Sequence, residues 1–375
     1  MRVVHLMKGS ACVYGAERVL LAELAELRAQ GVDARFVMLQ EARLGEQSDV
    51  LGQAVEALGL PVARVPVESV FSRRVVADLR RVLEEERPAV VHSHGYKADV
   101  IGLLACRLAK LPIVGEVSGW LFPKEDYKVR FYEWLDVQAL KRMDRVIVLA
   151  DHYRRMTLRM GIGREQLRLI PSGVDPASLR ARAGRAELRQ RLGLPVGVPT
   201  VGMLTRLSPE KGVDIFLRAV ALVAPAVPRM RAVIFGTGPE EETLRGLAAE
   251  LGIEQWVVWA GYVDEAMDAL LALDVVAQTS RTEALPQTLM EAMVMERPVV
   301  VTAVGGCPEL VVDGRTGFVS PSMDPETIAA RILCLLTRPE LRRQMGVEGA
   351  RRIDERYTLR KWAQDTIQLY EEFRH

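Results

Sequence analysis

Two glutamates and a basic loop are the residues of this sequence whose types and spacing could do chemistry. Glu283 lies in the stretch TSRTEALPQTLMEAM, and Glu291 follows it eight positions later. Arg206 and Lys211 lie earlier, in TVGMLTRLSPEKGVDIFLRAV. Arg presents a planar fork to a phosphate and Lys a point charge, whereas carboxylates accept hydrogen bonds from sugar hydroxyls. A ligand with both a diphosphate and sugar rings would use both kinds of group.

Each of these sets is predicted to follow a strand and precede a helix. One buried strand ends at about Leu204, and Gly212 opens an amphipathic helix. Another strand ends near Ala277, and Pro286 suits the first position of the next helix. The free amides of both helix starts would favour an anion at the same sheet edge. From the local pattern alone, surface positions for the cations and capping or salt-bridge roles for the glutamates remain open.

Glycines follow two other predicted strands. Gly9 and Gly15 bound a loop in MKGSACVYGAE, where a ligand could approach the backbone closely. That loop fits neither the dinucleotide fingerprint nor a P-loop. Gly236, in GTGPE, forms a similar turn before a helix that starts at about Pro239. Taken alone, such turns are more often structural than functional.

The stretch VVHSHGYKAD places two histidines at the end of a predicted strand. His92 and His94 would point to the same side of the sheet if the strand continues through them. A metal would need a third ligand at a suitable spacing, and the sequence shows none, so hydrogen bonding to an acceptor or proton handling is the favoured role. No Asp-x-Asp pair occurs in the chain. We therefore expect no metal and no cofactor.

The elements that would position these residues alternate between short β-branched runs and longer amphipathic segments. This alternation predicts βαβ units and parallel sheets, and it breaks at the proline- and glycine-rich connector PSGVDPASLRARAGRAELRQRLGLPVGVPT. We expect two Rossmann-like domains of an α/β fold, residues 1–173 with a C-terminal helix at about 355–375, and residues 174–354. A ligand would lie at the carboxyl ends of the strands, in the cleft between the halves. The last helix should dock, because Trp362, Leu369 and Phe373 share one face.

Length and composition exclude several other classes of protein. A chain of 375 residues with 49 % hydrophobic and 26 % charged residues is long enough for two packed cores. The formal charge of +1 argues against a dedicated nucleic-acid binder. The amino end lacks the pattern of a signal peptide and no apolar run approaches a membrane span, which predicts a cytoplasmic location. The cysteines are scattered and are expected to be buried and reduced: Cys12, Cys106, Cys307 and Cys334.

Several motifs together resemble the retaining glycosyltransferases of family 4, which have the two-domain GT-B fold. They are TRLSPEKG, GTGPEEETLRGLAAELG, the EALPQTLME run and AMVMERPVVVTAVGGCPELVVDGRTGFVSP. The early Gly-Ala-Glu turn, HSHGYKAD and PSGVD add to the likeness, which covers nearly the whole chain. Its specificity is greatest from Val201 to Pro321.

The resemblance implies a role for each matching residue. Arg206 and Lys211 match the basic pair that binds the donor diphosphate, Glu283 would hold hydroxyls of the donor sugar, and Glu291 would hold those of the ribose. Gly15 would lie against the donor phosphates. The donor site implied by the whole match also includes Gly236, Tyr262, Val263, Ala284, Leu285, Pro286, Gln287 and Thr288.

The resemblance also implies a mechanism. The diphosphate leaves and the acceptor attacks from the same face of the sugar, so that the anomeric configuration is retained without an enzymic nucleophile and usually without a metal. Catalysis then consists of positioning and of electrostatic stabilisation of the leaving group. Many members carry a His-Gly pair where this chain has Ser118 in VSGW, so the histidine's role is open unless His94 takes it over. Acceptor-side candidates are therefore His92, His94, Ser118 and Trp120.

The sequence thus predicts a hexosyltransferase that uses a UDP-sugar rather than a GDP-sugar and a glycan or lipid-linked glycan acceptor, in the biosynthesis of a cell-surface polysaccharide or glycolipid. A sugar-nucleotide epimerase of the same fold and a non-catalytic nucleotide-sugar-binding subunit remain alternatives. The segment FPKEDYKVRFYEWLDVQALKRMDRV mixes basic and aromatic residues. It suits either the surface of an anionic membrane or an ordinary amphipathic helix.

Overall fold

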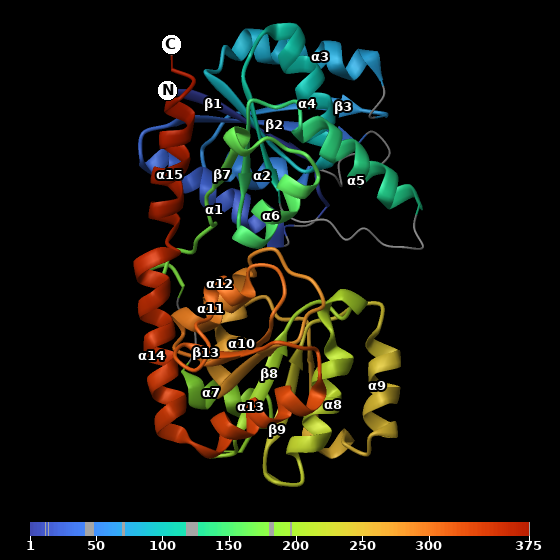
Figure 1. Cartoon of the computed structure of the whole chain (residues 1–375), viewed down its shortest axis with the longest axis vertical. Coiled ribbons are helices and arrows are strands. Elements are labelled where there is room, and N and C mark those ends of the chain that lie inside the picture. The colour runs from blue at the N-terminus through green and yellow to red at the C-terminus, as the bar shows by residue number, and fades with distance from the viewer. Residues whose placement is uncertain are drawn as a thin grey trace. The chain divides into compact units, whose positions relative to one another are not determined.

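The computed structural model divides the chain into two compact units. Unit 1 comprises Met1–Pro171 and Leu359–His375, and unit 2 comprises Ser172–Thr358 (Figure 1). The structure describes all residues except Cys12, Tyr14, residues 42–48, Val70, Phe71, residues 118–126 and 180–183, Val196 and His375.

Unit 1 is built on a seven-stranded parallel sheet in the order β3-β2-β1-β4-β5-β6-β7. The chain order reverses between β1 and β4, which pair with each other in the middle of the sheet. Strands β4 and β5 are buried at every position, as is typical of strands in a parallel sheet that is covered on both faces. The strands are β1 (Arg2–Lys8), β2 (Asp33–Glu41), β3 (Val62–Val67), β4 (Val90–His94), β5 (Ile113–Val117), β6 (Arg145–Val148) and β7 (Leu167–Leu169).

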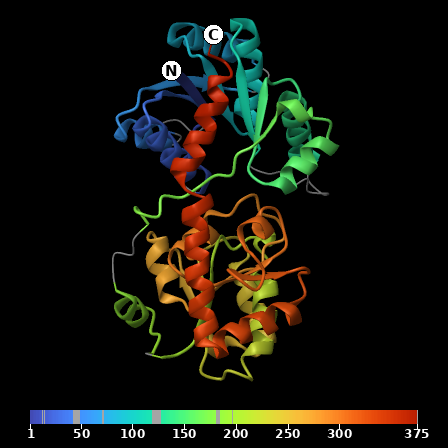
Figure 2. The same ribbon diagram turned by 60° about the vertical axis from the view of Figure 1, so that its left-hand side comes forward.

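Helices cover this sheet, and the last one comes from the far end of the chain. They are α1 (Gly15–Ala29), α2 (Val50–Ala57), α3 (Arg73–Glu86), α4 (Tyr96–Ala109), α5 (Tyr127–Leu140), α6 (Asp151–Arg159) and α15 (Leu359–Glu371). Helix α15 packs against α1, as Figures 1 and 2 show. It buries Trp362, Leu369 and Tyr370 almost completely, and Glu372 just beyond it pairs with Arg145 and Arg168. The C-terminal helix therefore packs on unit 1, whereas Phe373, predicted to share its buried face, lies beyond the end of the helix and is half-buried.

Unit 2 contains a six-stranded parallel sheet in the order β10-β9-β8-β11-β12-β13. Here the chain order reverses between β8 and β11, which pair directly. The strands are β8 (Thr200–Leu204), β9 (Arg231–Phe235), β10 (Val257–Gly261), β11 (Val275–Gln278), β12 (Val299–Thr302) and β13 (Gly317–Ser320).

The helices of unit 2 lie around its sheet and pack hydrophobic side chains against it. Helix α8 packs on α13, α7 on α10 and α11 on α14. Phe216 and Phe235 of this unit are among the largest fully buried side chains of the protein. The helices are α7 (Arg185–Arg191), α8 (Val213–Val223), α9 (Glu241–Glu250), α10 (Ala266–Ala272), α11 (Gln287–Val294), α12 (Cys307–Leu310), α13 (Pro325–Thr337) and α14 (Pro339–Arg356).

Several element ends differ slightly from the prediction. The units divide at 171/172 and 358/359 rather than at 173/174 and 354/355, because α14 continues to Arg356 and packs on α11 in unit 2. Pro286 is the residue before α11 rather than its first helical residue. Within the part of the chain that the structure describes, no helix combines the length and apolar character needed to cross a membrane.

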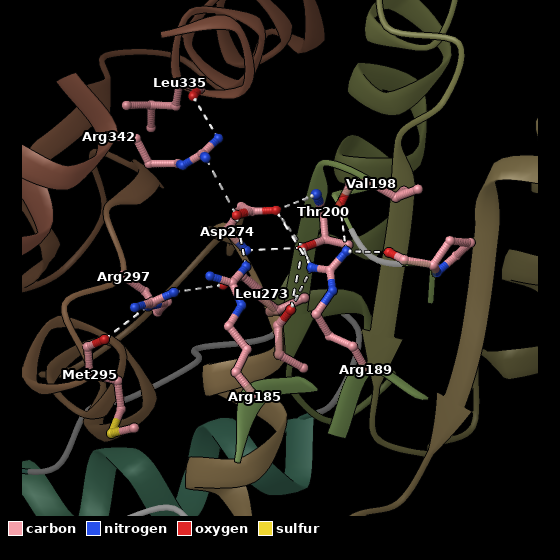
Figure 3. Close-up of polar contacts among 12 residues, drawn as sticks. Arg185, Arg189, Val198, Thr200, Leu273, Asp274, Met295, Arg297, Leu335 and Arg342 are labelled. Carbon is pink, nitrogen blue, oxygen red and sulfur yellow. Dashed lines mark hydrogen bonds and ion pairs between the residues drawn. The ribbon is translucent and has the colours of Figure 1, made fainter. Parts of the chain in front are cut away.

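A buried charge network ties the amino edge of the unit 2 sheet together (Figure 3). Asp274, directly before β11, accepts hydrogen bonds from the amide and hydroxyl of Thr200 at 2.9 and 3.0 Å. Arg185 lies 2.8 Å from the same carboxylate, and Arg189 and Arg342 lie at 3.7 and 3.6 Å. The two arginines of α7 thus join the connector to the core that follows it.

Candidate functional site

The predicted donor residues lie on two loops that leave neighbouring strands at the switch in chain order of unit 2. One loop runs from the end of β8 to α8 and carries Arg206 and Lys211; the other runs from the end of β11 to α11 and carries Glu283. Because both strands are parallel, their carboxyl ends meet at the same edge of the sheet. Ligands of open α/β sheets bind at this kind of position.

Glu283 is the centre of this region. Its Oε1 atom lies 2.8 Å from Lys211 Nζ and accepts hydrogen bonds from Gln278 Nε2 at 2.7 Å and Ser280 Oγ at 2.6 Å. The Glu283 side chain is 7 % exposed and that of Lys211 27 % exposed. The carboxylate is therefore held by three donors, while the ammonium that pairs with it still reaches solvent.

Contacts between the two loops fix this pair. Thr279 Oγ1 donates to the carbonyl of Gly212 at 2.8 Å, and the Arg281 amide donates to the carbonyl of Glu210 at 2.8 Å. The Arg281 guanidinium pairs with Asp214 at 2.7 Å. Gly212 has φ +62°, and a Cβ there would lie 2.1 Å from the Thr279 carbonyl oxygen. Only glycine allows the loops to approach so closely.

A third turn supports the Glu283 loop from the other side. Gly305 has φ +53°, and a Cβ there would lie 1.6 Å from the carbonyl oxygen of Glu283. The amide of Gly306 donates to the carbonyl of Ala284 at 2.7 Å. Thr302, at the end of β12, donates its hydroxyl to the carbonyl of Ser280 at 2.6 Å. The backbone that carries Glu283 is thus held at both ends.

Gly236 has a comparable role beside the Arg206 loop. Its φ is +120°, and a Cβ there would lie 1.9 Å from the carbonyl oxygen of Thr205. The Leu207 amide donates to the carbonyl of Thr237 at 3.0 Å. Arg206 itself is exposed, and among the described residues no hydrogen bond or ion pair to its guanidinium is found. That side chain is available to an anion at this edge.

The remaining donor candidates surround α11. Glu291 is 8 % exposed and Leu285 5 %, while Ala284 and Thr288 are half-buried. Gln287 donates its side-chain amide to Ser172 Oγ at 2.8 Å. Its side chain therefore anchors α11 to the connector PSGVD. The sequence does not predict this hydrogen bond.

Three further candidates have less defined surroundings. Tyr262 is 62 % exposed and Val263 half-buried, both directly after β10. Gly15 begins α1 in unit 1, and an added Cβ would meet nothing within 4 Å. Ser118 and Trp120 lie outside the described residues, so their assignment to the acceptor side stays a prediction.

His92 and His94 lie in β4 of unit 1 and join a third histidine, His5 of β1, which the sequence analysis did not single out. His5 Nδ1 lies 3.0 Å from His94 Nε2. The rings of His92 and His94 are 4.3 Å apart between centroids, so the two side chains do share one face of the sheet. His92 Nδ1 lies 2.6 Å from the hydroxyl of Tyr370 on α15.

These histidines are neutral. Burial lowers the pKa of His5 and His92 well below the ordinary value, with the nearby His94 contributing, and burial lowers the pKa of His94 to about 4. Burial also raises the pKa of the neighbouring Glu116 carboxyl to about 7. The prediction of an acceptor-side or proton-handling role for His92 and His94 remains untested by this geometry.

Sequence reasoning missed residues that hold the site rather than face a ligand. Gln278, Ser280 and the Gly305-Gly306 pair position Glu283, and His5 completes the histidine cluster. A polar residue inside an apolar strand, as in RVVHLM, is a usable signal because buried polar groups need a partner. The partners of Glu283 carry no comparable signal, since Ser280 lies in a loop and Gln278 at the end of a strand, where polar side chains are usually solvated.

In chemical terms, unit 2 places the exposed guanidinium of Arg206, the partly exposed ammonium of Lys211 and the oriented carboxylate of Glu283 at a single sheet edge. The cations can bind and neutralise phosphate, and the carboxylate can accept hydrogen bonds from hydroxyls.

Two family models match the chain in succession. Residues 184–352 match the family described as glycosyl transferases group 1, and residues 14–173 match the glycosyl transferase 4-like domain. The two matches follow the two units of the structure and contain the loops described above.

Related proteins include enzymes with different donors. A GDP-mannose-dependent alpha-(1-6)-phosphatidylinositol monomannoside mannosyltransferase of Mycolicibacterium smegmatis is 34 % identical over 244 residues, which span 61 % of this chain and 61 % of that protein. A D-inositol 3-phosphate glycosyltransferase of Acidothermus cellulolyticus is 30 % identical over 78 % of this chain and 68 % of its own length. A UDP-Gal:alpha-D-GlcNAc-diphosphoundecaprenol alpha-1,3-galactosyltransferase of Escherichia coli is 25 % identical over 81 % of this chain and 80 % of its own length.

Solved structures share the fold. HepE of Anabaena, solved in complex with UDP, aligns with a TM-score of 0.86 and 22 % identity over 99 % of this chain and 100 % of its own. Together with the two parallel sheets, this likeness confirms the α/β GT-B fold class.

Proposed function

The chain belongs to the group 1 glycosyl transferases, and from that premise we propose that it transfers a hexose from a UDP-sugar to a glycan or lipid-linked glycan with retention of configuration. The observation that carries the proposal is the Lys211–Glu283 pair, with a distance of 2.8 Å between the charged atoms. The two residues lie on two loops at the switch point of the unit 2 sheet, and a hydrogen bond and an ion pair connect these loops. This pair places a phosphate-binding cation beside a hydroxyl-binding carboxylate.

We propose the nucleobase of the sugar donor from the relatives. HepE was solved with UDP and with UDP-glucose, and the Escherichia coli relative is named for a UDP-Gal donor. The Mycolicibacterium smegmatis relative depends on GDP-mannose, so guanosine donors are the direct competitor in any test. We favour uridine because HepE, which shares the fold over 99 % of this chain, was solved with UDP and with UDP-glucose.

In the proposed mechanism, Arg206 and Lys211 bind the diphosphate and stabilise its charge as the bond to the sugar breaks. Glu283 accepts hydrogen bonds from the donor sugar, and Glu291 from the ribose. The amides of Ala284 and Leu285 assist near the sugar and the phosphates. Because Lys211 is paired with Glu283, the lysine would be shared between the carboxylate and the arriving diphosphate. Its place between them links the two halves of the donor.

No side chain of the protein forms a covalent intermediate in this scheme. The acceptor attacks the anomeric carbon on the face from which the diphosphate departs and loses its proton toward the departing phosphate oxygen. The positive charge of the basic pair replaces a metal at the diphosphate. We therefore propose that transfer needs no added metal, and the rate should not rise when Mg²⁺ or Mn²⁺ is supplied.

The experiment combines a donor panel with one substitution. UDP- and GDP-sugars are screened for thermal stabilisation, since a ligand that binds the folded state raises its apparent stability. The stabilising donor is then used in transfer assays with wild-type protein and Glu283→Gln. The control is Glu340→Gln, which changes a glutamate with a side chain 84 % exposed.

We expect transfer by wild type and Glu340→Gln and none by Glu283→Gln. Stabilisation by GDP-sugars alone would overturn the proposal that the donor nucleotide is uridine diphosphate. Interconversion of the nucleotide-sugar without acceptor would establish an epimerase instead. Full transfer activity in Glu283→Gln would overturn the proposal that Glu283 binds the hydroxyls of the donor sugar.

For the acceptor side we propose unit 1, with His94 and the residues around it, in the synthesis of a cell-surface polysaccharide or glycolipid. Helix α5 supports a lipid-linked acceptor, because Tyr127, Phe131 and Trp134 are 78 %, 48 % and 54 % exposed along it. Lys128 and Arg130 lie among them. Exposed aromatic residues beside basic ones suit the surface of an anionic membrane, so we propose peripheral attachment at the cytoplasmic face.

Liposome flotation tests the membrane contact. Wild type should float with anionic vesicles and not with neutral ones, and Phe131→Ser with Trp134→Ser should stay at the bottom. Leu222→Ser, which removes a 48 % exposed apolar side chain from α8, is the control and should float as wild type does. Equal flotation of all three proteins would reject α5 as the membrane contact.

A further inference from the structure

Three histidines gather on one face of the unit 1 sheet, a group here called the histidine cluster: His5, His92 and His94. His5 pairs directly with His92 in the register of β1 and β4, and His94 follows two positions on, so all three side chains leave the sheet on the same side. Their side chains are 0 %, 0 % and 8 % exposed. The cluster is therefore part of the interior of unit 1.

The spacing of the rings is that of ligands around one ion. One nitrogen from each histidine lies within 4.8 Å of the others. The ring centroids are 5.1, 5.3 and 4.3 Å apart. Two nitrogens on a tetrahedral zinc ion lie roughly 3.4 Å apart, given Zn–N bonds of about 2.0–2.1 Å, and the His5 Nδ1 to His94 Nε2 distance is 3.0 Å.

A carboxylate lies next to the cluster. Glu116 of β5 pairs in register with His94 and is 8 % exposed. Its Oε2 atom lies 3.9 Å from His92 Nε2. A carboxylate oxygen and imidazole nitrogens form a common ligand set for zinc.

Two atoms that would bind the ion are buried and lack hydrogen-bond partners among the described residues: His92 Nε2 and Glu116 Oε2. Buried polar atoms in proteins nearly always have a partner, and exceptions call for a ligand, an ion or a water. Imidazole nitrogens that offer a lone pair are suited to a divalent transition metal.

Tyr370 supplies the orientation that a metal-binding histidine requires. Its hydroxyl lies 2.6 Å from His92 Nδ1, which leaves Nε2 as the nitrogen that faces Glu116. Metal-bound histidines usually use their second nitrogen in a hydrogen bond of this kind. Because Tyr370 lies on α15, the same contact connects the cluster to the docked C-terminal helix.

We propose that His5, His92 and His94 bind a divalent transition metal of the zinc class, with Glu116 as the fourth ligand. Imidazole with one carboxylate suits Zn²⁺ and Co²⁺ rather than Mg²⁺ or Ca²⁺, which take oxygen ligands. All four ligands belong to the core of unit 1, so the ion would be structural: it would join β1, β4 and β5 and, through Tyr370, hold α15. A metal-bound His94 could not serve the acceptor as a free imidazole.

This inference is independent of the proposed donor site, because no ligand belongs to the donor loops of unit 2, but it excludes the acceptor role proposed above for His94. Loss of metal with donor binding intact, or loss of donor binding with metal intact, would separate the two.

The test uses full-length protein without a histidine tag, produced in medium supplemented with Zn²⁺. Metal content is measured by mass spectrometry for wild type, His5→Gln, His92→Gln and His152→Gln. His152 lies on α6, outside the cluster, and serves as the matched control. We expect about one metal ion per chain in wild type and His152→Gln and at least a fivefold loss in the other variants. Equal metal content in all four proteins would overturn the proposal, as would wild-type protein without metal.

A second measurement does not depend on the stability of the variants. Wild-type protein is unfolded in chelator and refolded with one equivalent of Co²⁺. The expected result is a set of visible absorption bands typical of four-coordinate cobalt, which excess Zn²⁺ abolishes. Refolding to active protein without such bands would overturn the proposal and assign the unpartnered atoms to buried water.

Discussion

Strand β11 has a buried carboxylate at each end, and the two have different surroundings. Asp274, before the strand, contacts Thr200 and three arginines at the amino edge of the sheet (Figure 3). Glu283, after the strand, contacts Lys211, Gln278 and Ser280 at the carboxyl edge. The charges are similar, but the partners of Asp274 join core elements, whereas those of Glu283 lie at the end of β11 and in two loops beside an exposed arginine.

The pKa of Asp274 reflects this difference. Burial alone would raise it, but the hydrogen bond and charge of Arg185, with the charge of Arg342 and the Thr200 amide, hold it below its ordinary value of 3.8. The charged form is therefore the stable one in the folded protein. Because the charge of Asp274 is balanced by arginines and hydrogen bonds, this carboxylate contributes to stability. Glu283 is paired with a partly exposed lysine and can exchange that partner for a ligand. The comparison predicts that substitutions at the two ends of β11 have separate effects.

The largest effect is expected from Lys211→Ala. Removal of one group that stabilises developing charge typically lowers kcat by about 10²–10³-fold, and the free energy of unfolding should change little because Lys211 is part-exposed. Steady-state kinetics and denaturant unfolding measure both quantities. Lys361→Ala, which breaks an exposed pair with Asp365, is the control and should alter neither. Loss of stability without loss of turnover in Lys211→Ala would contradict the comparison.

Asp274→Ala should have the opposite result. Breaking a buried ion pair costs about 3–5 kcal/mol, and we expect about 3 kcal/mol, the lower end of that range, because Arg185 and Arg342 are 37 % and 23 % exposed and can regain water. The transfer rate of the folded fraction should stay close to that of wild type. Urea unfolding gives the first quantity and single-turnover kinetics at low temperature the second. A stable but inactive variant would show that the amino edge also acts in catalysis.

Gly305→Ala sharpens the comparison by moving the Glu283 backbone without touching its side chain. An added Cβ would lie 1.6 Å from the Glu283 carbonyl oxygen, and overpacking of this kind costs about 1–3 kcal/mol. Misplacement of a catalytic group by roughly 1 Å can cost about 100-fold in rate, so activity should fall more than stability does. Gly246→Ala on α9 is the control, since its Cβ would meet nothing within 4 Å. Wild-type turnover in Gly305→Ala would show that Glu283 needs no such support.

The smallest expected effect is that of low pH on the difference in unfolding free energy between wild type and Asp274→Ala. Since the folded-state pKa of Asp274 is depressed, its contribution is fully present above the ordinary value of 3.8 and is lost as the pH falls through the folded-state pKa. The difference in unfolding free energy between wild type and Asp274→Ala should therefore narrow as the pH is lowered from 6 to about 3. Chemical denaturation at several pH values measures this. A constant difference over that range would mean that folding does not lower the pKa of Asp274.

The donor loops could be predicted from the sequence because their signals are local. Strand ends, Gly212 and Pro286 mark where each loop begins and ends, and the types of Arg206, Lys211 and Glu283 indicate their chemistry. The Asp274 network could not, since Arg185 and Arg342 are far apart in the chain and look like surface residues of amphipathic helices. His5 was missed for a similar reason: its partners come from another strand and from the last helix. Long-range polar contacts follow from the packing of elements, which periodicity alone does not specify.

The most direct test of the central claim separates the two parts of the donor. Calorimetric affinities for UDP and for the matching UDP-sugar are measured in wild type and Glu283→Gln. If Lys211 and Arg206 hold the diphosphate while Glu283 holds the sugar, the substitution should leave the UDP affinity within about threefold and remove any additional affinity that the sugar provides, a hydrogen bond to a charged group being worth about 1.5–3 kcal/mol. Equal loss of affinity for both ligands would contradict this division of roles.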